Sequence, residues 1–186
     1  MEYAKQLRVL VVEPSNYLSG IIRDALENNL SIPNVTLCRS GKDGCGLLAE
    51  ARVNLLLVKV DPDCPDGVPL IAQIRANDTK APRDLPVVAM TGAPTRQLVV
   101  QLRDLGVNEI LALPLSAKAL AERIQSVFEH PRDWIVAANY VGPDRRRKTS
   151  IHYRGSERRD GDDDGDGALL LTEKLAPPPR AGKDPA

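Results

Sequence analysis

The sequence lacks several features that would point to a particular class of protein. Its 186 residues include 25 basic and 25 acidic side chains, so the formal net charge is zero. A zero net charge excludes a global electrostatic attraction to nucleic acid or to a membrane surface. The two histidines, His130 and His152, form no Ser-His-Asp set or metal-binding cluster, and the chain has no phosphate-loop motif. An enzyme is therefore the least favoured class.

Cysteine and long apolar runs are also scarce. The three cysteines, Cys38, Cys45 and Cys64, show no CxxC spacing, which favours reduced thiols over a disulfide framework. No stretch approaches the length of a membrane span, and the first residues lack the apolar core and the cleavage site of a signal peptide. We therefore expect a cytoplasmic protein that does not enter a membrane.

Composition divides the chain into three parts. Apolar residues are dense up to about Phe128, and after this point most prolines and glycines lie among charged residues. We therefore predict a folded domain over residues 1–130, an arginine-rich extension over 131–160 and an acidic, proline-rich disordered tail over 161–186.

Five short apolar runs rich in branched residues predict strands, most of them buried on both faces. These runs cover residues 7–12, 35–39, 54–60, 86–90 and 109–113. Segments with helical spacing follow each run, which gives five alternations of strand and helix. Such alternation predicts an α/β fold, a doubly wound five-stranded parallel sheet flanked by helices. Functional groups are then expected at the carboxyl ends of the strands.

The ends of the predicted helices have recognisable signals. Ser15 and Ser116 are placed to cap the first and last helices, and Gly106 is placed to end the fourth. The helices near 41–51 and 67–77 have weaker patterns, because glycines lower helix propensity in one and a proline restricts the start of the other.

Four motifs fall at the ends of the predicted strands. They are VLVVEPS, LLLVKVDPDCPDG, VVAMTG and GVNEILALPLSAKAL. In this order and spacing they resemble the receiver domain of bacterial response regulators. The resemblance covers residues 7–129 and implies a flavodoxin-like receiver fold and a role in two-component, phosphorelay-type signal transduction. We expect no DNA-binding domain.

The resemblance also implies which groups a working receiver needs. Two acidic residues after the first strand bind magnesium, and an aspartate after the third strand is the phosphoryl-accepting nucleophile. A hydroxyl after the fourth strand follows the new phosphate and pulls its loop inward. A lysine before a proline after the fifth strand neutralises phosphoryl oxygens.

Six residues of this chain fall at those positions, three of them retained and three altered. The retained residues are Glu13, Thr91 and Pro114, and the altered ones are Pro14, Lys59 and Leu113. Pro14 offers no carboxylate to a metal, and the ammonium of Lys59 has no lone pair with which to attack a phosphoryl donor. The resemblance therefore implies a degenerate phosphorylation pocket, an atypical pseudo-receiver.

Two interpretations of this pocket remain open. Asp61 lies two residues beyond Lys59 and therefore on the same face of an extended strand, so it is an alternative phosphoryl acceptor. The Asp66-Gly67 pair fits the family pattern only with Lys59 at the acceptor position, which disfavours Asp61. The favoured interpretation is an ion pair between Lys59 and Glu13 that holds the domain in one conformation.

The extension contains two similar pieces, YVGPDRR and YRGSERR. Guanidinium groups bind phosphate oxygens bidentately and stack on rings, so such pieces suit a phosphate or a nucleobase. The GPDRRR segment is similar to extensions of some small alphaproteobacterial receivers, a subset of which bind cyclic di-GMP through an arginine-rich segment. A solvated basic linker is the favoured alternative. The candidate ligand-binding residues are Tyr140, Arg145, Arg146, Arg147, Tyr153, Arg158 and Arg159.

The acidic run after the extension matches the spacing of a calcium-binding EF-hand loop. The matching positions include Asp162, Asp164, Asp166 and Glu173. An EF-hand needs a helix on each side, and neither flank predicts one, so a chance match in a low-complexity run is favoured. We expect no metal and no cofactor.

Together these patterns predict a non-phosphorylatable pseudo-receiver that acts by protein-protein interaction in bacterial two-component-type signalling. The resemblance places the partner-binding surface between Thr95 and Phe128. The alternative is a sensor that binds cyclic di-GMP or another phosphorylated ligand through the arginine-rich extension.

Overall fold

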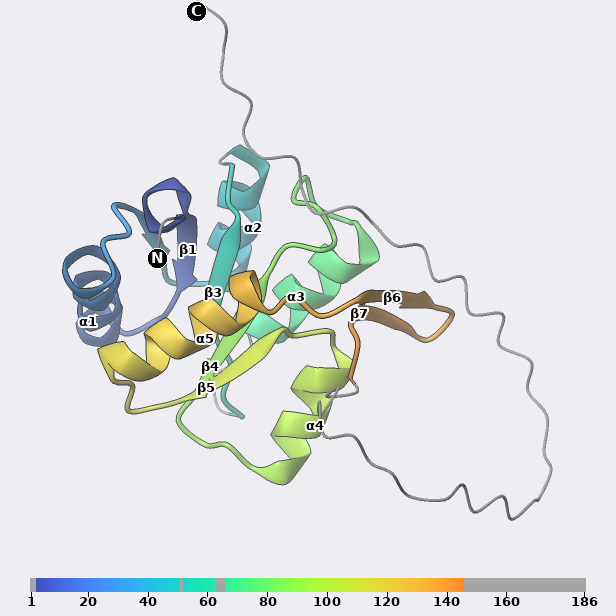
Figure 1. The fold of residues 1–186 in the computed structure, drawn as a ribbon. Helices are drawn as coiled ribbons and strands as arrows, with labels where there is room; N and C mark the ends of the chain where they lie inside the picture. Colours follow the sequence, from blue (N-terminus) through green and yellow to red (C-terminus); the bar gives the residue numbers. More distant parts are fainter. Residues whose placement is uncertain (1–2, 51, 63–65, 146–186) are drawn as a thin grey trace, which may run out of the picture.

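The apolar runs form one parallel sheet in a computed structural model of the chain, which describes residues 3–50, 52–62 and 66–145 (Figure 1). Its strand order is β2-β1-β3-β4-β5, with every neighbouring pair parallel. Every predicted strand boundary is confirmed to within one residue. The strands are β1 (Arg8–Val12), β2 (Asn34–Cys38), β3 (Leu55–Lys59), β4 (Val87–Thr91) and β5 (Glu109–Ala112).

Helices follow the strands as the alternation predicts. They are α1 (Asn16–Asp24), α2 (Gly41–Glu50), α3 (Gly67–Ala76), α4 (Arg96–Asp104) and α5 (Ala117–Glu129), with a short 3-10 turn η1 (Ala4–Gln6) and a π-helical turn η2 (Ala25–Asn29) after α1. The predicted caps are confirmed, because the hydroxyls of Ser15 and Ser116 accept backbone hydrogen bonds from Leu18 and Ala119. In the part of the chain that the structure describes, no helix is long and apolar enough to cross a membrane.

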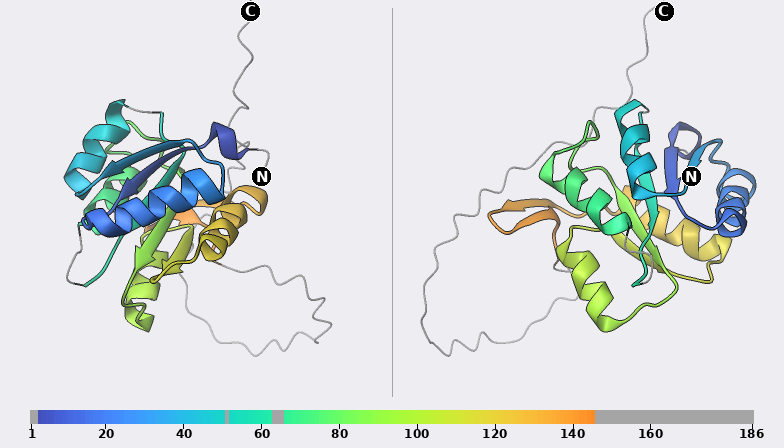
Figure 2. Two further views of the ribbon diagram at one scale, coloured as in Figure 1. Left: turned by 90° about the vertical axis from the view of Figure 1, so that its left-hand side faces the viewer. Right: turned by 180° about the vertical axis from the view of Figure 1, so that it is seen from behind.

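Alternation along each strand divides the core into two layers, one on each face of the sheet. Helices cover both faces (Figure 2). Val9 and Val11 of β1 face the layer formed with α1, η2 and α5. Leu10 and Val12 of the same strand face the layer formed with α2, α3 and α4. Because both faces are covered, the central strands are buried along most of their length, and polar groups can reach solvent only near their ends.

A β-hairpin follows α5. Its strands β6 (Trp134–Ala137) and β7 (Tyr140–Pro143) pair antiparallel, with Trp134 opposite Pro143. The connection is the two-residue turn Ala138–Asn139. The sequence contains a signal for this hairpin that the composition obscured, namely two short runs with branched and aromatic residues separated by two residues.

Two glycines allow the hairpin to approach the domain closely. Gly106, which ends α4 with φ +84°, would place a Cβ 2.4 Å from the carbonyl oxygen of Val141. Gly142 would place one 2.6 Å from the Cα of Gly106 and 2.6 Å from the hydroxyl oxygen of Tyr140. Real Cβ atoms do not tolerate such distances, so backbone contact at this point requires glycine on both sides.

A buried arginine joins the same region. Arg75 of α3 is 6% exposed, and its guanidinium lies 5.0 Å from the centre of the Trp134 ring. Burial lowers the pKa of Arg75 to about 10, so the side chain stays charged at neutral pH. The guanidinium donates hydrogen bonds to the carbonyl oxygens of Gly106, Arg83 and Leu85 and to the side-chain oxygen of Asn108.

Regular structure therefore continues past Glu129, where the composition led us to expect the core to end. Residues 134–143 form a hairpin packed against the domain, although we placed them in a separate arginine-rich extension. The physical reason is that the two short apolar runs of the hairpin lie among charged residues, which hide them in the composition of the segment, and that contacts with Gly106 and Arg75 hold the hairpin on the domain. Residues 146–160 of the extension and the tail over 161–186 lie outside the described residues.

We predict that Gly142→Ala weakens the docking of the hairpin. The added methyl group overlaps the backbone at Gly106, so the free energy of unfolding should fall by about 1–3 kcal/mol. Trp134 is the single tryptophan of the chain, so its fluorescence should change as it leaves Arg75. Urea unfolding followed by fluorescence measures both effects.

Gly20→Ala in α1 is the matched control. A Cβ at Gly20 meets nothing within 4 Å, and alanine favours a helix over glycine by about 0.5–1 kcal/mol. This variant should be as stable as the parent or more so, with unchanged fluorescence. Equal behaviour of the two variants would contradict the proposed glycine contact.

Candidate functional site

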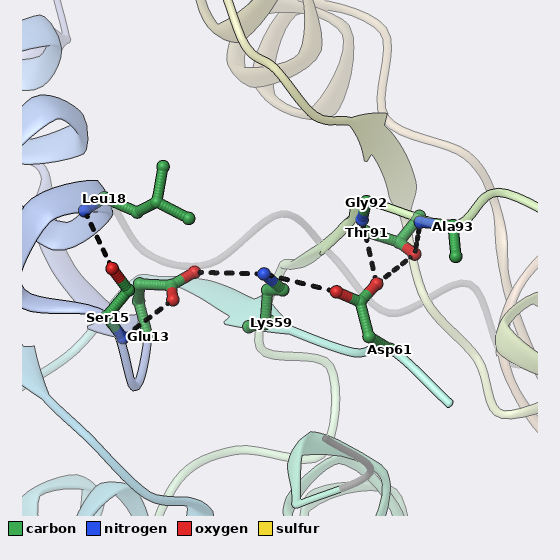
Figure 3. A network of polar contacts seen from close by, with 8 residues as sticks. All are labelled: Glu13, Ser15, Leu18, Lys59, Asp61, Thr91, Gly92 and Ala93. Carbon is green, nitrogen blue, oxygen red and sulfur yellow. Dashed lines mark hydrogen bonds and ion pairs between the residues drawn. The ribbon is translucent and has the colours of Figure 1, made fainter. Parts of the chain in front are cut away.

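The polar side chains at the carboxyl edge of the sheet meet in one pocket (Figure 3). Glu13 follows β1, Lys59 is the last residue of β3 and Thr91 is the last residue of β4. Because β3 lies between β1 and β4, the side chain of Lys59 is central. Asp61, two residues beyond Lys59, also points into this pocket.

Lys59 lies between two carboxylates. Its Nζ is 3.9 Å from Oε2 of Glu13 and 3.2 Å from Oδ2 of Asp61, and its side chain is 15% exposed. The expected ion pair with Glu13 is thus present, but Asp61 is the nearer partner. The ammonium is therefore attracted by two carboxylates, one on each side of it (Figure 3).

Asp61 makes the most complete set of contacts in the pocket. Its Oδ1 accepts hydrogen bonds from Thr91 Oγ1 at 2.6 Å and from the backbone N–H of Gly92 at 2.8 Å. Burial alone would raise the pKa of Asp61, but the two hydrogen bonds and the ammonium of Lys59 outweigh it, and the pKa lies below its ordinary value. With a side chain that is 12% exposed, Asp61 is a charged group held inside the protein.

Glu13 is the most deeply buried member, with a side chain that is 1% exposed. Its Oε1 accepts the backbone N–H of Ser15 at 2.9 Å. Among the described residues, its Oε2 has no hydrogen-bond donor and faces Lys59 alone. The Lys59 ammonium is therefore the group that compensates this buried oxygen.

The other positions implied by the resemblance add no charge to the pocket. Pro14 is exposed and has no ligand atom in its side chain. Leu113 supplies a half-buried apolar side chain and donates its backbone N–H to the carbonyl oxygen of Thr91 at 2.7 Å. It precedes Pro114 through a cis peptide bond.

The residues present do not fit a magnesium ion. Magnesium requires oxygen ligands in near-octahedral geometry, and the carboxylates of Glu13 and Asp61 flank an ammonium instead. Within the described ranges, no group of three or more His, Cys, Asp or Glu side chains could hold a metal ion. The cation between these two carboxylates is the ammonium of Lys59, a side chain of the protein itself.

A glycine at the start of α3 packs closely against the end of β3. A Cβ on Gly67 would lie 2.6 Å from the carbonyl oxygen of Lys59, so the start of α3 packs directly on the end of β3. The Asp66-Gly67 pair thus lies directly beside Lys59, and the assignment of Lys59 to the acceptor position stays a prediction from the sequence. Asp61 nevertheless enters the pocket, and the same-face argument was the one signal for it in the sequence.

The described part of the extension is occupied by contacts within the chain. Arg145 lies 3.7 Å above the ring of Tyr140 and pairs with Asp104 of α4 at 3.1 Å. Tyr140 donates its hydroxyl to the carbonyl oxygen of Pro143. Outside the described residues lie the other candidate ligand-binding positions, Arg146, Arg147, Tyr153, Arg158 and Arg159, and the calcium-loop positions, Asp162, Asp164, Asp166 and Glu173.

The two described thiols are unpaired. Cys38 and Cys45 are both free, and the pKa of Cys38 is raised to about 11, chiefly by burial and also by the nearby Asp43. Cys38 is therefore protonated at neutral pH and a poor nucleophile. Cys64 lies outside the described residues.

Sheet order and helix placement define a doubly wound, flavodoxin-like α/β domain. The family model of the response regulator receiver domain matches residues 9–125. The chain belongs to the response regulator receiver family. The match ends before the β6–β7 hairpin begins.

Similar proteins include chemotaxis proteins and a longer regulator. Chemotaxis protein CheY of Pseudomonas aeruginosa is 24% identical over 123 residues, which cover 66% of this chain and 97% of that protein. Response regulator PleD of Caulobacter vibrioides is 27% identical over 125 residues, which cover 67% of this chain and 26% of that protein.

Solved structures share the fold. The chemotaxis response regulator CheY4 of Vibrio cholerae superimposes with a TM-score of 0.57 at 16% identity, covering 66% of this chain and 98% of that one. A CheY-like receiver domain of Methanospirillum hungatei gives a TM-score of 0.57 at 18% identity, covering 67% and 94%.

We predict that the charge of Asp61 makes stability depend on pH. A carboxyl group whose pKa is lower in the folded state stabilises the fold above its unfolded pKa of about 3.9, and this contribution is lost as the pH falls through the folded value. Asp61→Asn should therefore be less stable than the parent at pH 7, and the difference should shrink below about pH 4. Urea unfolding over this pH range measures it.

The control for this experiment is Asp66→Asn. Asp66 is exposed and makes no side-chain capping hydrogen bond at the start of α3. The Asp66→Asn substitution removes the same charge as Asp61→Asn but outside the Glu13–Lys59–Asp61 network. The stability of this variant should therefore follow that of the parent at each pH. If the stability of Asp61→Asn also followed that of the parent at each pH, the Asp61 carboxylate would contribute nothing to stability through its charge.

Proposed function

We propose that this receiver domain does not accept a phosphoryl group and acts as a pseudo-receiver, by binding a protein partner in bacterial two-component-type signalling in the cytoplasm. The observation that carries the proposal is the ammonium of Lys59 at the acceptor position, between Glu13 and Asp61. Membership of the receiver family supports the signalling role.

Phosphoryl transfer needs three groups that this pocket does not supply together. The acceptor position offers an ammonium, which is not a nucleophile. The metal position has one carboxylate, and that carboxylate faces Lys59. The cation that would neutralise phosphoryl oxygens is replaced by Leu113.

Asp61 is also poorly suited to the role of an alternative acceptor. Both of its oxygens are engaged, Oδ1 with Thr91 and Gly92 and Oδ2 with Lys59. Attack on a phosphoryl donor would require an oxygen to leave these donors, and no bound metal would assist it. We therefore assign Asp61 to the charge network rather than to catalysis.

The partner surface that we propose is the region between Thr95 and Phe128, formed by α4, β5 and α5. Val99 and Val100 of α4 are each 38% exposed; among the described residues the other exposed large apolar side chains are Tyr17 and Ile21 of α1. A surface of this kind needs no phosphoryl group to be available to a partner. The names of the relatives suggest chemotaxis as one setting. The partner itself would be selected by the exposed side chains of this surface.

A second candidate function is a ligand sensor. The observation that favours it is the anchoring of Arg145, which pairs with Asp104 and stacks on Tyr140. Arg145 lies beside α4, and binding of cyclic di-GMP or another phosphorylated ligand next to this arginine in the sequence would act on the proposed partner surface. Guanidinium groups suit such a ligand, because they bind phosphate bidentately and stack on bases.

Incubation with acetyl phosphate and magnesium should leave the mass of the protein unchanged, because Lys59 offers no nucleophilic oxygen. Intact-mass spectrometry makes the measurement, and a receiver with a complete set of acidic residues serves as the positive control. A stable phospho-protein would overturn the proposal. The Asp61→Asn variant would then decide whether Asp61 is the acceptor.

The sensor candidate predicts a saturable heat when cyclic di-GMP is titrated into the protein. Arg146→Ala with Arg147→Ala should abolish this heat, because these arginines would bind the ligand. Arg145→Ala is the comparison variant, since it removes an arginine that is already paired with Asp104. Absence of heat from the unmodified protein would dispose of this candidate.

A further inference from the structure

Three hydrogen-bond donors converge on the carboxylate of Asp61. Thr91 Oγ1 lies 2.6 Å and the backbone nitrogen of Gly92 lies 2.8 Å from Oδ1, while Lys59 Nζ lies 3.2 Å from Oδ2 (Figure 3). A hydroxyl, a backbone N–H and an ammonium around one anion are the usual components of an oxyanion-binding site. In this protein the anion is part of the chain.

Glu13 and Asp61 compete for the ammonium of Lys59. Lys59 lies closer to Asp61 than to Glu13, although Glu13 is the more deeply buried acid. A lysine whose role was to compensate Glu13 alone would make its shorter contact with Glu13. Asp61 is therefore a principal ligand of Lys59 and not a bystander at the edge of the pocket.

The backbone of Gly92, rather than its missing side chain, makes the contact. A Cβ at this position would lie 3.5 Å from Asp61 Oδ2, which is an ordinary van der Waals distance. The site thus does not need glycine for space. It needs the N–H of Gly92 in its present orientation, and that orientation belongs to the loop before α4.

A chain of hydrogen bonds leads from this site to α4. Thr91 Oγ1, which donates to Asp61, accepts the backbone N–H of Ala93 at 3.2 Å. The carbonyl oxygen of Ala93 accepts the N–H of Thr95 at 2.8 Å, and the hydroxyl of Thr95 caps α4 by accepting from Leu98 at 3.2 Å. The position of the Asp61 carboxylate is in this way tied to the start of α4.

We propose that Lys59, Thr91 and Gly92 form an oxyanion-binding site whose resident ligand is the chain's own Asp61 carboxylate, and that this carboxylate fixes the loop before α4. The site would take a free tetrahedral oxyanion such as phosphate only after the carboxylate is removed. This goes beyond the proposed function, since it names the group that fills the pocket and the segment that the group positions.

Asp61→Ala tests the proposal in the full-length protein. Its amide resonances at Gly92, Ala93 and Thr95 should move away from those of the parent in nitrogen–proton correlation spectra. Inorganic phosphate, titrated at constant ionic strength, should move them back toward the parent positions in a saturable manner. The parent protein should show no such response, because Asp61 occupies the site.

Asp66→Ala is the matched control, since it removes an exposed carboxylate close in sequence. Its loop resonances should match the parent, with no phosphate response. Loop resonances of Asp61→Ala that equal those of Asp66→Ala would overturn the proposal. A changed loop that does not respond to phosphate would overturn it as well, because the donors would then not form an anion site.

A second variant decides the matter if Asp61→Ala does not fold. Thr91→Val removes one donor and conserves the volume of a buried side chain, and it should shift the Gly92 and Ala93 amides without creating a phosphate response. Unchanged amides would overturn the proposed connection. These readouts are independent of acetyl phosphate labelling, so a phosphorylatable protein and a failed anion site are separate outcomes.

Discussion

The carboxyl edge of this sheet depends on one ammonium placed between two carboxylates. Without Lys59, Glu13 and Asp61 would be two acids in a pocket that excludes most solvent, where like charges are costly. One cation leaves the trio with a single net negative charge. The N–H groups of Ser15 and Gly92 and the hydroxyl of Thr91 stabilise this remaining charge, so three strand ends cooperate in one electrostatic arrangement.

The sheet and its helices could be predicted from the sequence because their signals are local. Branched apolar runs marked the five strands, and the side-chain oxygens of Ser15 and Ser116 marked two helix starts. The weak pattern over 67–77 also formed a helix, α3. A proline in the first turn costs little there, since no intrahelical hydrogen bond is lost.

The pocket and the hairpin were less predictable because both depend on contacts between distant residues. Alternation along β3 allowed Asp61 to face the pocket, but the donors that hold it come from the end of β4. The sequence alone indicates that Arg75 is an ordinary helix-surface residue. In the structure the turn at Gly106 and the ring of Trp134 cover it. The sequence carries no local signal for either contact.

Helix α4 is fastened at both ends. Its first turn is capped through the hydrogen-bond chain from Asp61, and Asp104 at its last turn is paired with Arg145 just beyond the hairpin. Nine residues of α-helix span only about 14 Å, so the two attachments are joined by a short rigid rod. A displacement at either attachment would therefore shift α4 as a unit, and Val99 and Val100 would move with it. The Asp61 network and the end of the hairpin are thus connected through one helix.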